Sequence, residues 1–233
     1  VYSYGSTGAR QGKFTLGPST NVRGVTTIGA GNPIWTVDND DKVYVYDSVA
    51  GTLLGSWAAT GVNNPEDIAT DGTDIWIVDR SDDRVYRFAG AASRRSGSQS
   101  AVSSINLHSQ NGDAYGLATD GTKFWVVDKN ASAVFIYNVS SGAYLGKWTI
   151  DSRNKQPTGI TIDPNSGNDM WIVDRQTNTV YRYADARTRL SGSQNYTDAF
   201  SLDSGNSRPE GIADPTFVYM LNTVINSNIS VPG

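Results

Sequence analysis

Short apolar segments alternate with polar turns along nearly the whole chain. Each segment is about four to seven residues long, is rich in β-branched and aromatic side chains, and is bounded by Gly, Asp, Asn or Ser, a pattern typical of strands joined by tight turns. No stretch places helix-forming residues at helical spacing, and no run approaches the ~18 consecutive apolar residues of a membrane helix. The pattern therefore predicts an all-β protein without membrane insertion.

One aromatic motif occurs five times. An apolar segment carries an aromatic residue at its second position and ends in Asp or Asn; the five aromatic residues are Trp35, Trp76, Trp125, Trp171 and Tyr219. They are spaced by roughly 40–50 residues, which is the period of four-stranded propeller blades. The motif is apolar on both faces, which favours a strand buried on two sides and tryptophans packed between blades.

Every repeat has the same order of four segments. The second repeat, for example, runs from 66–71, the innermost strand A, through strands B and C to strand D at 101–107. Alternate repeats differ: the second and fourth share a long SGSQ connector (96–99 and 191–194), whereas the first and third share an LGxW ending. This alternation indicates duplication of a two-blade unit.

The two ends of the chain complement each other. Residues 1–16 supply C and D segments without A and B, and residues 209–222 supply A and B. We therefore predict a five-bladed β-propeller of four-stranded antiparallel blades, closed by pairing of the N-terminal strands with the C-terminal blade. Residues 1–222 form the single domain and 223–233 are a tail or the start of a linker. The alternative is an incomplete six-bladed or larger array that continues beyond residue 233.

The repeated aspartates have a structural interpretation. Each B segment ends in a carboxylate or an amide, and the residues are Asp38, Asp79, Asp128, Asp174 and Asn222. An Asp after a strand accepts hydrogen bonds from backbone N–H groups two or three residues on and fixes the turn. The acidic runs 38–42 and 79–83 could hold Ca²⁺ through oxygen atoms, but they lack the ordered ligand spacing of a calcium loop. No cofactor is expected.

Composition excludes several functions. The 19 basic and 23 acidic residues give a formal charge of −4, which disfavours binding to nucleic acid or to anionic membranes. The chain has no Cys and one His, His108, so thiolate chemistry and the usual zinc sites are excluded. No Gly-x-Ser-x-Gly elbow or phosphate-binding glycine loop occurs. The sequence favours a protein without catalytic activity.

A binding site is predicted where the repeat is regular but the residue type varies. The B–C turns and the loops leading into strand A open on one face of a propeller, around its axis. Two sets of residues share this face, one directly after each Asp and one at the start of each A strand. The candidates are Asn39, Arg80, Lys129 and Arg175 in the turns, and Arg23, Glu66, Tyr115, Thr158 and Glu210 on the A strands. We expect them to surround a ligand or a partner.

The motifs PEGIADP, PTGITIDP and VYRY (209–215, 157–164 and 180–183) resemble NHL-like β-propeller repeats of secreted or cell-surface bacterial proteins. The resemblance implies an extracellular or cell-surface module that binds a protein or a glycan, within a larger assembly or a longer chain. Related propellers include lactonases and lyases, so a carboxylate and metal site at the channel is one alternative and a multivalent lectin is another. The chain begins with Val and shows no signal segment, so we expect a removed leader or a piece of a longer protein.

Overall fold

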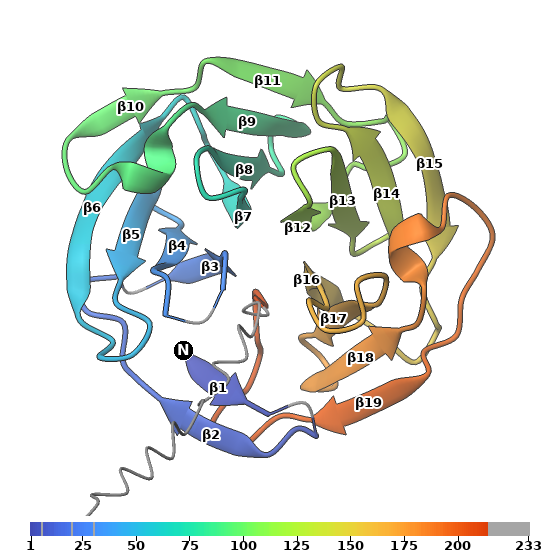
Figure 1. Cartoon of the computed structure of the whole chain (residues 1–233). Helices are drawn as coiled ribbons and strands as arrows, with labels where there is room; N and C mark the ends of the chain where they lie inside the picture. Colours follow the sequence, from blue (N-terminus) through green and yellow to red (C-terminus); the bar gives the residue numbers. More distant parts are fainter. Residues whose placement is uncertain (6, 20, 30, 214–233) are drawn as a thin grey trace, which may run out of the picture.

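A computed structural model of the chain describes residues 1–5, 7–19, 21–29 and 31–213. They form an all-β propeller in which four four-stranded antiparallel blades stand around an axis (Figure 1). Strand bounds in the first two blades are β3 (Val22–Thr27), β4 (Ile34–Asp38), β5 (Lys42–Tyr46) and β6 (Leu53–Thr60), then β7 (Pro65–Thr70), β8 (Ile75–Asp79), β9 (Arg84–Phe88) and β11 (Ser103–Asn106). The next two contain β12 (Ala114–Thr119), β13 (Lys123–Asp128), β14 (Ala133–Asn138) and β15 (Tyr144–Thr149), then β16 (Pro157–Ile162), β17 (Met170–Asp174), β18 (Thr179–Tyr183) and β19 (Asp198–Ser201).

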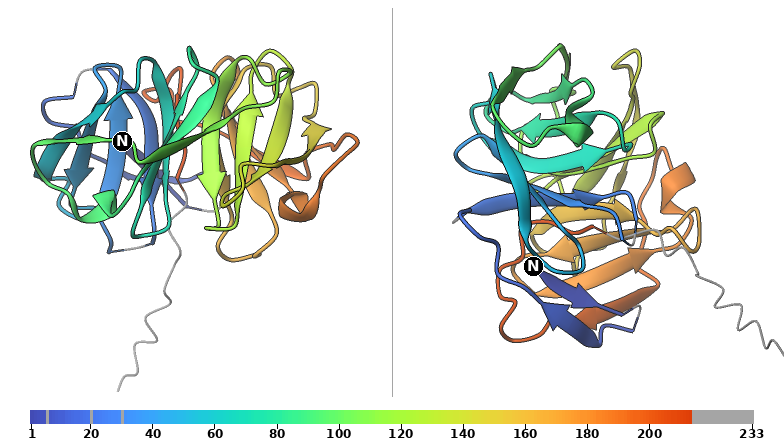
Figure 2. Two further views of the ribbon diagram at one scale, coloured as in Figure 1. Left: turned by 90° about the horizontal axis from the view of Figure 1, so that it is seen from above. Right: turned by 60° about the vertical axis from the view of Figure 1, so that its left-hand side comes forward.

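The innermost strands of the four blades, β3, β7, β12 and β16, are neighbours around the axis. Figure 2 shows the propeller from the side, where the strands run from one end of the axis towards the other. Within the described part of the chain, no helix is long and apolar enough to span a bilayer; the helices there are the short 3₁₀ turns η1 (Ala91–Ser93) and η2 (Ala186–Thr188).

Large aromatic side chains fill the spaces between blades. Trp35, Trp76, Trp125 and Trp171 are at most 8% exposed, which confirms their predicted place in the core. Trp57 and Trp148 at the D strands are also buried, where their rings contact Phe88 and Tyr183 of the next blade at 5.3 and 5.2 Å. Aromatic contacts of this kind bury a large apolar area, so each blade depends on its neighbour for its stability.

The SGSQ connectors bind neighbouring blades together. After strand C of blade two, the chain crosses back to blade one, where β10 (Ser98–Ser100) pairs in parallel with the outer strand β6 (Figure 1). The equivalent connector of blade four lies against β15 of blade three, with Thr149 paired to Ser193. A Cβ on Gly55 would collide with the Arg95 carbonyl of the crossing connector, which explains the glycine in the LGxW ending. The predicted two-blade unit is therefore a physical pair.

The predicted count of five complete blades is not matched by the described residues. The fifth position holds the two-stranded sheet of β1 (Tyr2–Tyr4) and β2 (Arg10–Lys13), together with residues 209–213, which are not part of a strand. The reason is that the predicted B strand falls in residues 217–222, outside the described residues, as does the predicted tail at 223–233.

The N-terminal hairpin nevertheless contacts the region that follows β19. The Tyr2 hydroxyl donates to the Gly205 carbonyl at 2.6 Å, and Arg10 pairs with Asp203 at 3.1 Å. Gly211 lies at the axis, where a Cβ added to it would be 3.1 Å from Gly24 Cα of β3, and one added to Gly159 of β16 would be 2.8 Å from Gly211 Cα. Residues near both ends of the described chain therefore occupy the space between blades four and one.

Candidate functional site

The aspartates that end the B strands position the candidate site. Asp79 is 0% exposed; its Oδ1 accepts hydrogen bonds from the N–H groups of Ser81 and Asp82, at 2.9 and 3.0 Å. Its Oδ2 accepts from the N–H groups of Asn63 and Asn64, at 2.6 and 3.0 Å, in the loop that leads into β7. The carboxylate thus joins the B–C turn to the start of the innermost strand.

The same arrangement recurs in the other blades. Asp128 and Asp174 accept from their own turns and from the N–H of Asp113 and Gln156, respectively, and Asp38 accepts from its own turn and from the Ser19 hydroxyl. The residue that follows each Asp also donates its N–H to the same loop, and these bonds are Asn39 to Asn21, Arg80 to Asn64, Lys129 to Asp113 and Arg175 to Gln156. The predicted turn function is confirmed for these four aspartates, whereas Asn222 lies outside the described residues. It explains why turn residues and A-strand residues meet at one end of the axis.

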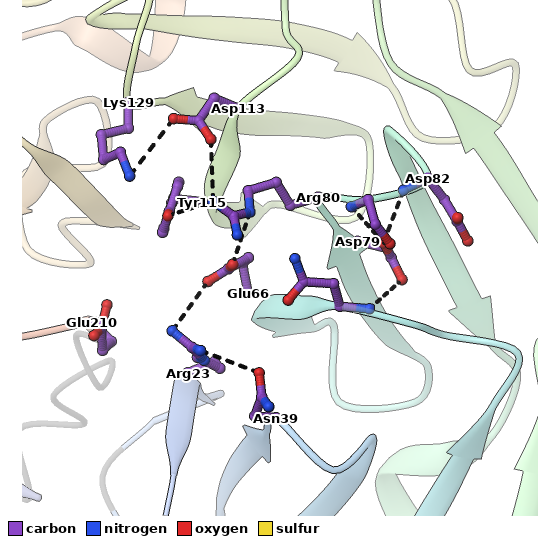
Figure 3. Close-up of polar contacts among 12 residues, drawn as sticks. Arg23, Asn39, Glu66, Asp79, Arg80, Asp82, Asp113, Tyr115, Lys129 and Glu210 are labelled. Atoms are coloured by element: carbon purple, nitrogen blue, oxygen red, sulfur yellow. Dashed lines mark hydrogen bonds and ion pairs between the residues drawn. The ribbon is translucent and has the colours of Figure 1, made fainter.

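The predicted site residues of blades one to three form a connected network (Figure 3). Glu66 is buried, with 1% of its side chain exposed, and its carboxylate lies 3.1 Å from Arg80 Nε and 3.9 Å from Arg23. Arg23 also donates to Asn39 Oδ1 at 3.1 Å. Burial raises the pKa of Glu66, and the two arginines oppose that rise.

Tyr115 extends this network into blade three. Arg80 donates to its hydroxyl at 2.7 Å, the Arg80 guanidinium lies 5.0 Å from the ring centre, and Lys129 Nζ lies 3.9 Å from it. Asp113 pairs with both cations, at 3.4 Å from Arg80 and 3.7 Å from Lys129. Asp113 is not among the predicted residues, although it lies two residues before Tyr115, in the loop whose N–H groups bind Asp128.

The remaining predicted residues have other hydrogen-bond and ion-pair partners. Arg175 pairs with Glu210 at 3.0 Å, and burial raises the pKa of Glu210 while Arg175 and Arg23 oppose the rise. Thr158 is 0% exposed, and its hydroxyl donates to the Pro209 carbonyl at 3.0 Å. We call the nine predicted residues together with Asp113 the polar ring.

In the polar ring, the side chains of the cations are more exposed than those of most carboxylates. Arg80 keeps 35% of its side chain exposed and the other three cations keep 21–22%, whereas Glu66 keeps 1% and Asp113 13%. Of the three carboxylates, only Glu210, at 21%, is as exposed as the cations. The surface offered to a ligand is therefore mainly cationic, although the whole chain carries a formal charge of −4. Such a surface attracts anionic groups over a distance of about a Debye length.

The described residues of the polar ring do not form a metal-binding cluster. His108 lies at the outer rim, where its ring is 4.4 Å from that of Tyr144. Among the described residues, no three His, Asp or Glu side chains are placed to hold a metal ion. In the acidic runs, the Asp38 and Asp79 carboxylates accept backbone N–H groups instead.

A hollow of about 410 Å³ lies at the other end of the inner strands. Several of its polar side chains are engaged: the Thr70 and Thr119 hydroxyls donate to backbone carbonyls of their own turns, and Asp120 pairs with Arg187 of blade four at 2.8 Å. The polar ring, with four partly exposed cations, is therefore the stronger candidate for a binding site.

Comparison with solved structures supports the propeller fold. The chain is similar to a glutaminyl cyclase from Myxococcus xanthus (TM-score 0.61, 12% identity, 84% of this chain and 82% of that one). It is also similar to a chain in the crystal structure of a nidogen/laminin complex (TM-score 0.54, 14% identity, 84% and 85%). The fold and these similarities define the protein as a β-propeller. At such low identity they show the fold alone.

No family model and no curated protein matches the sequence. The resemblance to NHL-like repeats therefore stays a prediction.

Proposed function

We propose that this β-propeller is a non-catalytic, extracellular or cell-surface module that binds a protein partner through the polar ring. The observation that carries the proposal is the convergence of predicted variable residues at one end of the axis, where four cations stay partly exposed while Glu66 and Asp113 are largely buried. One structural neighbour comes from a complex between two proteins. The glycan alternative is less well supported because Trp35, Trp76, Trp125 and Trp171 are buried and cannot stack on sugars.

The proposal is tested by capture of a partner with the full chain. The immobilised chain is exposed to the extracellular and cell-surface proteins of its source, and the captured protein is identified, purified and titrated. Replacing Lys129 and Arg175 by Ala should weaken binding by about tenfold or more, because charged contacts at the centre of an interface carry much of its affinity. Lys129 and Arg175 are chosen in preference to Arg80, because Arg80 pairs with the buried Glu66 and therefore also has a structural role.

The matched control replaces Lys13 and Arg84, two exposed residues outside the ring, and removes the same charge. Equal loss of binding in both double variants, or no loss in the ring variant, contradicts the proposal.

We also propose that residues 214–222 complete a fifth blade, which would hold Glu210 in its place in the polar ring. The contacts of the N-terminal hairpin with Asp203 and Gly205, and of Gly211 with its two neighbours at the axis, support this closure.

A pair of truncations measures that closure. Ending the chain after residue 213 should lower the free energy of unfolding by about 3 kcal/mol or more, since one large buried apolar side chain contributes about 1.5–3 kcal/mol. Ending it after residue 222 should leave stability within about 0.5 kcal/mol of the full chain. Urea denaturation of both truncated chains distinguishes the outcomes, and equal stability of the two excludes the fifth blade.

A further inference from the structure

The charged contacts of the polar ring follow a register from blade to blade. A cation in the B–C turn of one blade pairs with a group at the start of the next inner segment. Besides pairing with Glu66 of its own blade, Arg80 of blade two reaches Asp113 and Tyr115 before and on β12, and Arg175 of blade four reaches Glu210. By the same register, the counterpart of Lys129 of blade three would be Thr158, the second residue of β16.

Thr158 offers Lys129 no carboxylate. Its side chain is buried and its hydroxyl is engaged by Pro209. Lys129 instead turns back to Asp113, at 3.7 Å, which Arg80 also uses. The described ring therefore holds four cations, Arg23, Arg80, Lys129 and Arg175, against the three carboxylates Glu66, Asp113 and Glu210. One carboxylate is missing, and the register places the gap above Thr158.

We propose, on the basis of the proposed function, that the partner supplies this carboxylate. An acidic protein segment inserts an Asp or Glu side chain between Lys129 and Arg175, above Thr158. A carboxylate there forms charge-assisted hydrogen bonds with both cations, and such bonds are about twice as strong as neutral ones. The uneven ring thereby becomes a specific receptor for one acidic side chain.

A peptide fits this site better than an acidic glycan does. Sugar rings commonly pack on an exposed aromatic face, and the aromatic residue of the ring, Tyr115, is 6% exposed with two cations against it. The described residues of the site therefore offer charge and hydrogen bonds, which suit a flexible acidic side chain.

The test titrates the full chain with a blocked tetraglutamate peptide, followed by NMR of backbone amides. Tetraglutamine, tetragalacturonate and inorganic phosphate are the comparison probes. We expect saturable binding of tetraglutamate, centred on residues 129, 158 and 175, that weakens as salt increases. Equal or tighter binding of tetragalacturonate or phosphate overturns the assignment to an acidic peptide, and so does equal binding of tetraglutamine.

Thr158→Glu supplies the missing carboxylate from the chain itself and should weaken tetraglutamate binding by about tenfold or more. Thr158→Gln, which has a similar size and no charge, should weaken it much less. Because Thr158 is buried, Lys129→Gln provides a second variant at a partly exposed residue, and it should also weaken binding by about tenfold. Unchanged binding in Lys129→Gln overturns the inference, whether or not the Thr158 variants fold.

These outcomes separate the inference from the proposed function. Suppose that the Lys129 and Arg175 variant no longer binds the captured partner, but tetraglutamate does not displace that partner from the unchanged chain. The propeller is then still a binding module, and the proposal that an acidic segment occupies the site is overturned. If tetraglutamate binds specifically but no partner protein is captured, the carboxylate site is supported and the proposed binding of a protein partner is not.

Discussion

Replacing Asp79 by Ala is expected to lower the free energy of unfolding by about 3–5 kcal/mol, the scale seen when one member of a buried charged network is removed. Asp79 is 0% exposed, and its carboxylate accepts hydrogen bonds from four backbone N–H groups and the Ser81 hydroxyl. Ala leaves these donors without their acceptor. It also frees the turn that holds Arg80 beside Glu66, so affinity at the polar ring should fall as well.

Urea denaturation at neutral pH measures the loss, and Asp40→Ala is the matched control. Asp40 is an exposed aspartate of the equivalent turn in blade one. Its replacement should change stability by less than about 0.5 kcal/mol. Comparable losses in the two variants would show that total charge, and not the hydrogen-bonded carboxylate, explains the effect.

The pH dependence of the Asp79 effect has a defined sign. Burial tends to raise the pKa of Asp79, but hydrogen bonds from Asn64, Asn63, Ser81 and Asp82 outweigh it and leave the pKa below the usual value. The folded state therefore favours the ionised form. The stabilisation is complete above the unfolded pKa of about 3.9, and it is lost as the pH falls through the folded pKa. The stability difference between wild type and Asp79→Ala should shrink over that acidic range.

The blades and the polar ring were predictable from sequence because both depend on a repeated local pattern. A strand buried on two faces is apolar at nearly every position, so the tryptophan segments identified strand B. The Asp after it marked the turn. Once turn and inner strand were aligned across repeats, Arg80, Tyr115 and Lys129 fell on one face, where the structure places them in contact.

Other features depend on contacts between blades that no local pattern records. The connector that forms β10 is rich in Ser and Gly, and backbone hydrogen bonds hold it to β6, such as that from the Ala58 N–H to the Gly97 carbonyl at 3.0 Å. Its partner strand therefore could not be identified from side chains. Likewise, the sequence placed Thr158 in the ring, but its burial and its bond to Pro209 depend on how blade four meets residues 209–213.

Asp67 occupies the closest approach of the inner strands. The aligned positions in the other inner segments are Gly24, Gly116, Gly159 and Gly211, where an added Cβ would meet the next segment at about 3 Å or less. Asp67 is 1% exposed, and its carboxylate accepts hydrogen bonds from the N–H groups of Ile68 and Leu117, both at 2.8 Å, and interacts with that of Val25. One side chain thus joins β3, β7 and β12 at the axis.

Asp67→Gly should therefore be destabilising, although it restores the residue found in the other four segments. We expect a loss of about 3 kcal/mol or more, because each buried N–H left without a partner costs about 1–3 kcal/mol. Thermal and urea denaturation measure it. Gly112→Ala is the control, since the added methyl group meets nothing within 4 Å. Wild-type stability in Asp67→Gly would show that the axis closes without the carboxylate.

Two further measurements separate loss of the carboxylate from loss of packing. If the lost acceptor explains the effect, added formate should raise the melting temperature of Asp67→Gly above that in chloride at equal ionic strength, and leave wild type unchanged. Burial raises the pKa of Asp67 well above its usual value, against hydrogen bonds from Leu117, Ile68 and Val25. The folded state then holds this proton more tightly than the unfolded chain, so the stability of wild type relative to Asp67→Asn should be greatest below about pH 4 and fall as the pH rises towards the raised pKa. A relative stability that increases with pH would show that Asp67 is ionised at the axis and that its N–H donors outweigh the cost of burial.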